Sequence, residues 1–106
     1  MLMSDREIMD SKFIQSKNNM KYLKFEAGWC GACKMIQPQL NKVAAEGITV
    51  EKINAEHAAE LVTEYNVKNL PTVILVDDSG KEYHREVGSK MRAPQLIETY
   101  NNFANG

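Results

Sequence analysis

Alternating hydrophobic and polar residues predict four strands along this chain. The first covers residues 20–27, with Leu23 and Phe25 on one face and Tyr22 and Lys24 on the other. The third strand contains the unbroken apolar run Val-Ile-Leu-Val, which suggests burial on both faces, and the fourth strand carries charged residues that suit the edge of a sheet. In chain order, the second, third and fourth strands are predicted at residues 48–53, 72–76 and 81–87.

Apolar residues spaced three or four positions apart predict four helices. The helices are expected at residues 10–17, 33–46, 56–65 and in the stretch whose first turn holds Pro94. Pro38 should kink the second helix because proline removes a backbone hydrogen bond, and Gly47 should end it. Asn54 can cap the third helix. The predicted core positions are Ile36, Leu40, Val43 and Ala44 in the second helix, Ala58, Leu61, Val62 and Tyr65 in the third, and Leu96, Ile97, Tyr100 and Phe103 in the last.

The order of these elements predicts an α/β fold. A long helical link joins the first two strands, so they should be parallel with a right-handed crossover. Residues 77–80 form a turn signal that predicts an antiparallel hairpin between the third and fourth strands. A short edge strand closing at Ile8 and Met9 would bring the sheet to five strands. The length suits one domain over residues 1–106.

Composition and charge narrow the range of possible functions. Hydrophobic residues make up 43% and charged residues 25%, which are ordinary values for a soluble globular protein. The net charge of −1 offers no basic surface to nucleic acid or to an anionic membrane. No apolar run approaches the roughly 20 residues of a membrane helix, and the charged N-terminus lacks the apolar region of a signal peptide. We therefore expect a cytoplasmic protein with neither nucleic acid nor membrane as a partner.

The candidate chemistry lies at Cys30 and Cys33, the only cysteines of the chain. On the first turn of a helix, residues i and i+3 have Cβ atoms about 5–6 Å apart, near the roughly 3.5–4.5 Å of a disulfide. The first cysteine would lie at the helix N-terminus, where unpaired N–H groups and the helix dipole favour a thiolate. The pair therefore predicts an activated nucleophile with a resolving thiol in reach.

Two other uses of the cysteine pair are less favoured. Zinc needs four ligands, and the remaining candidates, His57 and His84, form neither an H-x3–5-H pair nor part of a second C-x-x-C, so no metal is expected. A structural disulfide closing so short a loop would stabilise the fold only weakly. In the cytosol a lone cysteine pair is usually catalytic, so redox chemistry is favoured.

From Asp10 to Phe103 the pattern resembles thioredoxin. The matching motifs are Trp29-Cys30-Gly31, Cys33-Lys34-Met35-Ile36 with Pro38, Lys52-x-Asn54, Leu70-Pro71-Thr72 and Val87-Gly88. A lone C-x-x-C would be weak evidence, but all of these motifs in order and spacing are specific. The resemblance implies a thioredoxin-like fold, in which a central mixed sheet of four or five strands is flanked by four helices.

The resemblance also implies roles for individual residues. Cys30 would be the attacking thiolate and Cys33 the buried resolving thiol of a protein-disulfide reductase. Pro71 would be a cis-proline facing the disulfide and would turn the Leu70 backbone toward a bound peptide, which could pair with it as an added strand. Trp29 would dock substrates, although a plain core aromatic is the alternative. The full substrate-binding set would be Trp29, Gly31, Ala32, Leu70, Pro71, Val87 and Gly88.

Partners and alternatives follow from the same resemblance. We expect a monomer that meets thioredoxin reductase and disulfide-containing proteins, with no bound cofactor beyond the redox-active Cys30–Cys33 disulfide. One alternative is a thioredoxin-fold oxidase or glutaredoxin-like protein, although Gly31 argues against glutathione use, which usually goes with C-P-x-C. A second alternative is a thioredoxin-fold binding subunit with incidental thiols, which the intact Trp29 and Pro71 make less favoured.

Two positions depart from the family pattern. Ala32 replaces the usual proline, so the helix start is expected to be looser and the reduction potential is left open. Lys24 stands where thioredoxins place a buried acid, and Lys52 occupies the matching partner position. Lys24 can reach the surface along its alkyl stem or pair with Glu26 on the same strand face. The functional hypothesis is that Lys24 stays near the thiols and favours the thiolate by its charge.

Overall fold

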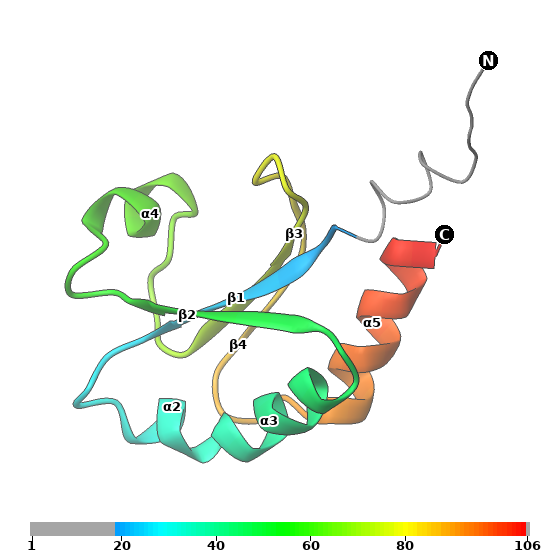
Figure 1. Ribbon diagram of the computed structural model, residues 1–106. Helices are drawn as coiled ribbons and strands as arrows, with labels where there is room; N and C mark the ends of the chain where they lie inside the picture. The colour runs from blue at the N-terminus through cyan, green and yellow to red at the C-terminus, as the bar shows by residue number, and fades with distance from the viewer. Residues whose placement is uncertain (1–18, 106) are drawn as a thin grey trace.

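The computed structural model describes residues 19–105, so the strand expected at Ile8 and Met9 and the helix expected at residues 10–17 lie outside the described part. Within it, the chain forms four strands and four helices (Figure 1). In order these are β1 (Lys21–Glu26), α2 (Gly31–Met35), α3 (Gln37–Ala45), β2 (Thr49–Asn54), α4 (Ala59–Glu64), β3 (Thr72–Val76), β4 (Glu82–Val87) and α5 (Ala93–Asn105).

The strands form one mixed sheet with the order β2-β1-β3-β4. β1 is parallel to β2 and antiparallel to β3, and β4 returns antiparallel to β3 as a hairpin. The predicted α/β class, the parallel first pair and the hairpin are therefore confirmed. β1 is flanked by strands on both sides, so the loop that follows it starts at the centre of the sheet.

Helices cover both faces of the sheet. α3 and α5 pack on one face around Tyr22, and α4 lies on the other face near Phe25 (Figure 1). The predicted division of β1 into two faces is correct. The central residues, from Tyr22 to Phe25, are nevertheless buried on both faces of the strand. The Tyr22 hydroxyl donates a hydrogen bond to the Leu96 carbonyl at 2.6 Å. Burial, helped by the charge of Glu86, raises the pKa of Tyr22 above its ordinary value.

The helix predicted at residues 33–46 is two helices, broken at Ile36. Ile36 caps the end of α2 and the start of α3, and Pro38 lies in the first turn of α3. Proline lacks an N–H and its ring crowds the carbonyl four residues earlier, so the distortion expected from Pro38 is present, but as a break between two helices and not as a kink in one. Ile36 is buried as predicted, whereas Ala44 is exposed, because the buried stripe of α3 is limited to Leu40 and Val43.

Two other helix predictions need correction. α4 begins at Ala59 rather than at residue 56, because the Asn54 side chain accepts a hydrogen bond from the Glu56 N–H at 2.9 Å in a turn that precedes the helix. Phe103 of α5 was expected to point inward but is 41% exposed, and its ring packs against Tyr83 with centroids 5.6 Å apart. At the end of α3, Gly47 has φ of +86°, which explains why glycine stands there.

The turn between β3 and β4 is organised by Asp77. Its carboxylate accepts hydrogen bonds from the Ser79 N–H and hydroxyl, from the Lys81 N–H and from the Tyr83 hydroxyl. These bonds, the one from the Ser79 side chain first, lower the pKa of Asp77 from 3.8 to about 2. The ionised carboxylate therefore favours the folded chain over the unfolded one.

We expect Asp77→Ala to lower the urea unfolding midpoint at pH 7. Since the folded-state pKa is depressed, this contribution is complete above about pH 3.8 and is lost as pH falls through about 2. The difference in midpoint between the variant and the wild type should shrink between these values. Asp78→Ala, next to it in the turn, is the control and should change the midpoint little. An undiminished Asp77→Ala difference at pH 2 would contradict this account.

Candidate active site

The two cysteines lie at the start of α2, just after the loop that follows β1. Cys30 is the N-cap of α2, and its sulfur accepts a hydrogen bond from the Cys33 N–H at 3.1 Å. The pair forms a disulfide with Cα atoms 5.3 Å apart. Both residues are buried, Cys33 more deeply at 2% exposure. The predicted position of the first cysteine at a helix N-terminus is confirmed, and it is the position in which a thiolate gains from the free N–H groups.

Exposed apolar side chains lie close to the cysteines in the sequence and in the fold. Trp29 is 70% exposed, so the alternative of a plain core aromatic is wrong. Its indole N–H donates a hydrogen bond to the Glu56 carboxylate at 3.0 Å, a partner that sequence reasoning did not find. Trp29 and Leu70 line an open pocket of about 410 Å³ together with Ala55, Val62, Val67, Lys68 and Asn69.

The loop before β3 places Leu70 against the two cysteines. Leu70 and Ala32 pack on the small cluster formed by Ala27 and the two cysteines. The Leu70–Pro71 peptide bond is cis. The Pro71 carbonyl accepts a hydrogen bond from the Gly88 N–H at 2.9 Å, and Val87 beside it is 51% exposed. Gly31 is exposed between the cysteines, and the residues expected to bind substrate come from three separate segments of the chain: residues 29–32, 70–71 and 87–88.

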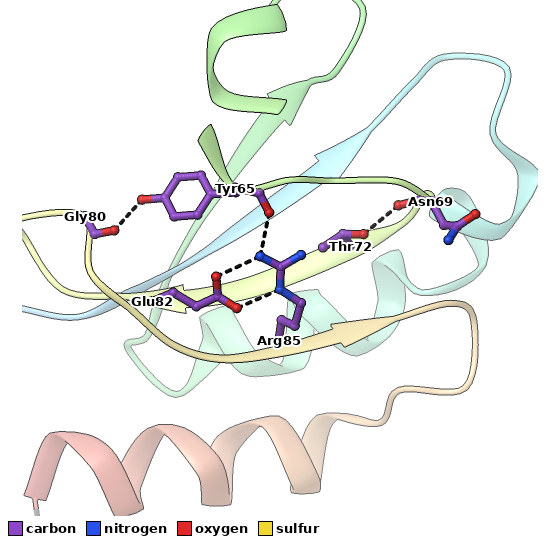
Figure 2. A network of polar contacts seen from close by, with 6 residues as sticks. All are labelled: Tyr65, Asn69, Thr72, Gly80, Glu82 and Arg85. Carbon is purple, nitrogen blue, oxygen red and sulfur yellow. Dashed lines mark hydrogen bonds and ion pairs between the residues drawn. The ribbon is translucent and has the colours of Figure 1, made fainter. Parts of the chain in front are cut away.

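A network of polar contacts fixes the ends of that loop (Figure 2). The Arg85 guanidinium of β4 donates to the Tyr65 carbonyl just past α4, and it pairs with Glu82. The Thr72 hydroxyl at the start of β3 donates to the Asn69 carbonyl. Arg85 therefore ties the loop's first end to β4, and Thr72 closes its second end, which leaves Leu70 in a defined position.

A second cavity, of about 440 Å³, is lined by Cys33 and by several charged side chains. Lys24 is buried there with its side chain 2% exposed. Its ammonium contacts the Glu26 carboxylate and the Gln37 side-chain carbonyl, each at 2.6 Å. The residues that line the cavity are Lys24, Glu26, Ala27, Gly28, Cys33, Lys34, Gln37, Lys52 and Asn54.

The sequence left two positions open for the Lys24 side chain, at the surface or paired with Glu26, and these contacts decide between them. The hypothesis that its side chain reaches the surface is wrong, and the pairing with Glu26 is confirmed. Lys52 is the register partner of Lys24 on β2 and lines the same cavity, but it is exposed. Of the three lysines that line the cavity, Lys24, Lys34 and Lys52, only Lys24 is buried. Gln37 was not predicted as a partner, because no sequence pattern links it to Lys24.

Comparison with known proteins identifies the family. The thioredoxin family model matches residues 5–102. The chain belongs to the thioredoxin family. A thioredoxin of Mycobacterium bovis is 35% identical over 98 residues, which are 87% of this chain and 84% of the relative. The crystal structure of thioredoxin from Trypanosoma brucei brucei superposes with a TM-score of 0.71 at 28% identity, covering 90% of this chain and 83% of that one.

Membership of the thioredoxin family settles the reaction class. The protein is a thiol–disulfide oxidoreductase that reduces protein disulfides by dithiol–disulfide exchange at Cys30 and Cys33. A relative from Mycobacterium leprae, a bifunctional thioredoxin reductase/thioredoxin, is 35% identical over 96 residues, which are 85% of this chain and 21% of that protein. In residues 19–105, no group of three or more His, Cys, Asp or Glu residues could hold a metal ion. None of the helices described is long and apolar enough to cross a membrane.

Proposed function

We propose that this thioredoxin uses Cys30 as its nucleophile and Cys33 as its resolving thiol. The Cys30 thiolate attacks a substrate disulfide, a mixed disulfide forms and one substrate thiolate leaves. The Cys33 thiolate then attacks the Cys30 sulfur, which closes the Cys30–Cys33 disulfide and frees the second substrate thiol. The position of Cys30 as the α2 N-cap, with the Cys33 N–H directed at its sulfur, carries this assignment.

We further propose that protein substrates dock on the surface formed by Trp29, Gly31, Ala32, Leu70, Pro71, Val87 and Gly88. The exposure of Trp29 and Val87 supports this assignment, since large apolar side chains in water favour contact with a partner. Leu70 precedes β3, so an extended peptide beside the disulfide can pair with its backbone as an added strand. Apolar contact would then supply affinity, and the backbone would orient the substrate disulfide.

Trp29→Ala should test this docking surface. We expect kcat/KM for insulin disulfide reduction to fall about ten-fold or more, the cost of losing an exposed aromatic anchor. The rate with a small aromatic disulfide should change little, because such a substrate needs no docking. Met35→Ala is the matched control, since Met35 is 69% exposed but outside the surface. Equal losses for both substrates, or for both variants, would rule the surface out.

The dithiol is regenerated by a thioredoxin reductase in this proposal, so that the protein carries electrons to its substrates as a cytoplasmic monomer. The relative that joins a thioredoxin reductase and a thioredoxin in one chain supports this pairing. A thioredoxin-fold oxidase or a glutaredoxin-like protein is the alternative left open by Ala32. The reduction potential separates them, since it would be near −270 mV for a thioredoxin-type reductant and near −120 mV for an oxidase.

Lys24 and Lys52 are proposed to favour the thiolate by their charges. Both line the cavity that Cys33 lines, and Lys24 is held there by Glu26 and Gln37. Lys24→Met should raise the pH at which half of the Cys30 thiol is ionised, because a positive charge is removed from the cavity that its partner Cys33 lines. Lys52→Met should raise this pH less, since Lys52 is exposed and screened by water. Ultraviolet absorbance of the thiolate measures both; an unchanged or lower value for Lys24→Met would exclude the role.

A further inference from the structure

The resolving step needs an acceptor for the Cys33 proton. Cys33 is 2% exposed, so bulk water has little direct access to its thiol. A thiol attacks a disulfide only as the thiolate, and its proton must therefore leave before or during the attack. The cavity beside Cys33 is the route by which a proton can move, because about 440 Å³ is ample space for several water molecules.

Glu26 is the one carboxylate among the described residues that line this cavity. The other charged groups that face it are Lys24 on the same strand, Lys34 on α2 and Lys52 on β2. A lysine ammonium group is a donor only and has no site that accepts a proton. Gln37 and Asn54 contribute only amides. Proton acceptance in the cavity is therefore left to Glu26 or to water.

The Glu26 carboxylate is held in place by Lys24 and is also partly exposed to solvent. Its Oε1 contacts the Lys24 ammonium at 2.6 Å, and the Gln37 side chain fixes that ammonium in turn. The Glu26 side chain is 28% exposed, whereas Lys24 is buried. A proton received from the cavity side can therefore pass to solvent. Lys24 is then a positioning residue, which holds the carboxylate at the cavity that Cys33 shares.

We infer that Glu26 accepts the Cys33 proton during resolution, through water in the cavity. The Cys33 S–H bond breaks and a proton reaches the Glu26 carboxylate, while the sulfur keeps the electron pair. That pair forms the bond to Cys30, and the substrate sulfur leaves as a thiolate. The carboxylic acid then returns its proton to solvent. This inference rests on the proposed roles of Cys30 and Cys33.

The two steps can be timed separately with an aromatic disulfide that releases a coloured thiolate. The reduced protein releases one thiolate when Cys30 attacks and a second when Cys33 resolves the mixed disulfide, both measured by stopped-flow absorbance. We expect Glu26→Gln to slow the second release about 10–100-fold at pH 7, because a positioned base is lost. The first release should change by less than about two-fold. The deficit should shrink as pH rises, since the thiol then ionises without help, and Glu26→Asp should recover part of the rate.

Glu26→Gln leaves the buried Lys24 charge without its counter-charge, so a second comparison removes that charge. Lys24→Gln/Glu26→Gln is compared with Lys24→Gln alone, and the two differ only in the carboxylate. A slower, pH-dependent second release in the double variant supports the inference. An equal second release in both, or equal slowing of both releases, overturns it. If Cys33→Ser with Glu26 intact still gives the second release, the proposed cysteine roles fail instead.

Discussion

Cys33→Ser is expected to hold substrate proteins on Cys30 as stable mixed disulfides, whereas Cys30→Ser should trap none. The sulfur of Cys30 lies at the N-cap of α2. In the proposed mechanism it forms the first bond to substrate, and Cys33 provides the sulfur that breaks this bond. Insulin reduction should fall by at least about a thousand-fold in Cys30→Ser, because the nucleophilic route is lost. Non-reducing electrophoresis followed by peptide mass spectrometry would show the trapped species and the cysteine that carries it.

The double variant Cys30→Ser/Cys33→Ser is the control and should match Cys30→Ser in both assays. A further check uses brief alkylation of the reduced wild-type protein at neutral pH. Cys30 should be labelled first, because Cys33 is more deeply buried and lies one turn into the helix. Labelling of Cys33 ahead of Cys30 would reverse the assignment.

Glu26→Ala should cost the protein about 2–3 kcal/mol of folding stability, somewhat below the usual loss for breaking a buried ion pair because Glu26 is partly exposed. The remaining Lys24 ammonium would keep only Gln37 as a partner in a buried position. Lys24→Met/Glu26→Ala should lie within about 1 kcal/mol of the wild type, since no unpaired buried charge is left. Urea unfolding at pH 7 of all variants in the same redox state would measure these free energies as a double-mutant cycle.

A second ion pair, between β1 and β2, provides the control. Lys21 and Glu51 contact each other at 2.7 Å, but both side chains are largely in water, at 40% and 49% exposure. Glu51→Ala should therefore cost no more than about 0.2–1 kcal/mol. Similar losses for Glu51→Ala and Glu26→Ala, or simple additivity of the Lys24→Met and Glu26→Ala losses, would show that the buried pair has no special weight.

The fold was largely predictable because its signals are local and agree with one another. Residues 73–76 form an unbroken apolar run, residues 77–80 form a turn, and Cys30 precedes a helical pattern, so strand, hairpin and helix cap follow directly. Pro38 marked a distortion of the helix, but not its extent, since the chemistry of proline does not fix whether a helix bends or ends. The turn at Asn54 was mistaken for a helix cap because one side chain serves both structures.

The charged side of the site was less predictable because its contacts are not local. Alternation placed Lys24 on the face of Tyr22, but it does not reveal that helices cover that face. Gln37 reaches Lys24 from 13 residues away along the chain. For Trp29, hydrophobicity alone would favour burial of the indole; the resemblance to thioredoxin instead implied a docking residue, and the fold leaves the side chain in water.

Trp29 is the chain's only tryptophan, and it directly precedes Cys30. Under selective excitation, the intrinsic fluorescence of the whole protein therefore originates beside the reacting sulfur atoms. A neighbouring disulfide quenches indole emission, and a docked partner changes its solvation, so reduction and docking should each alter the spectrum. The protein thus carries its own optical probe of the catalytic cycle, with no background from a second indole and no need for an attached dye.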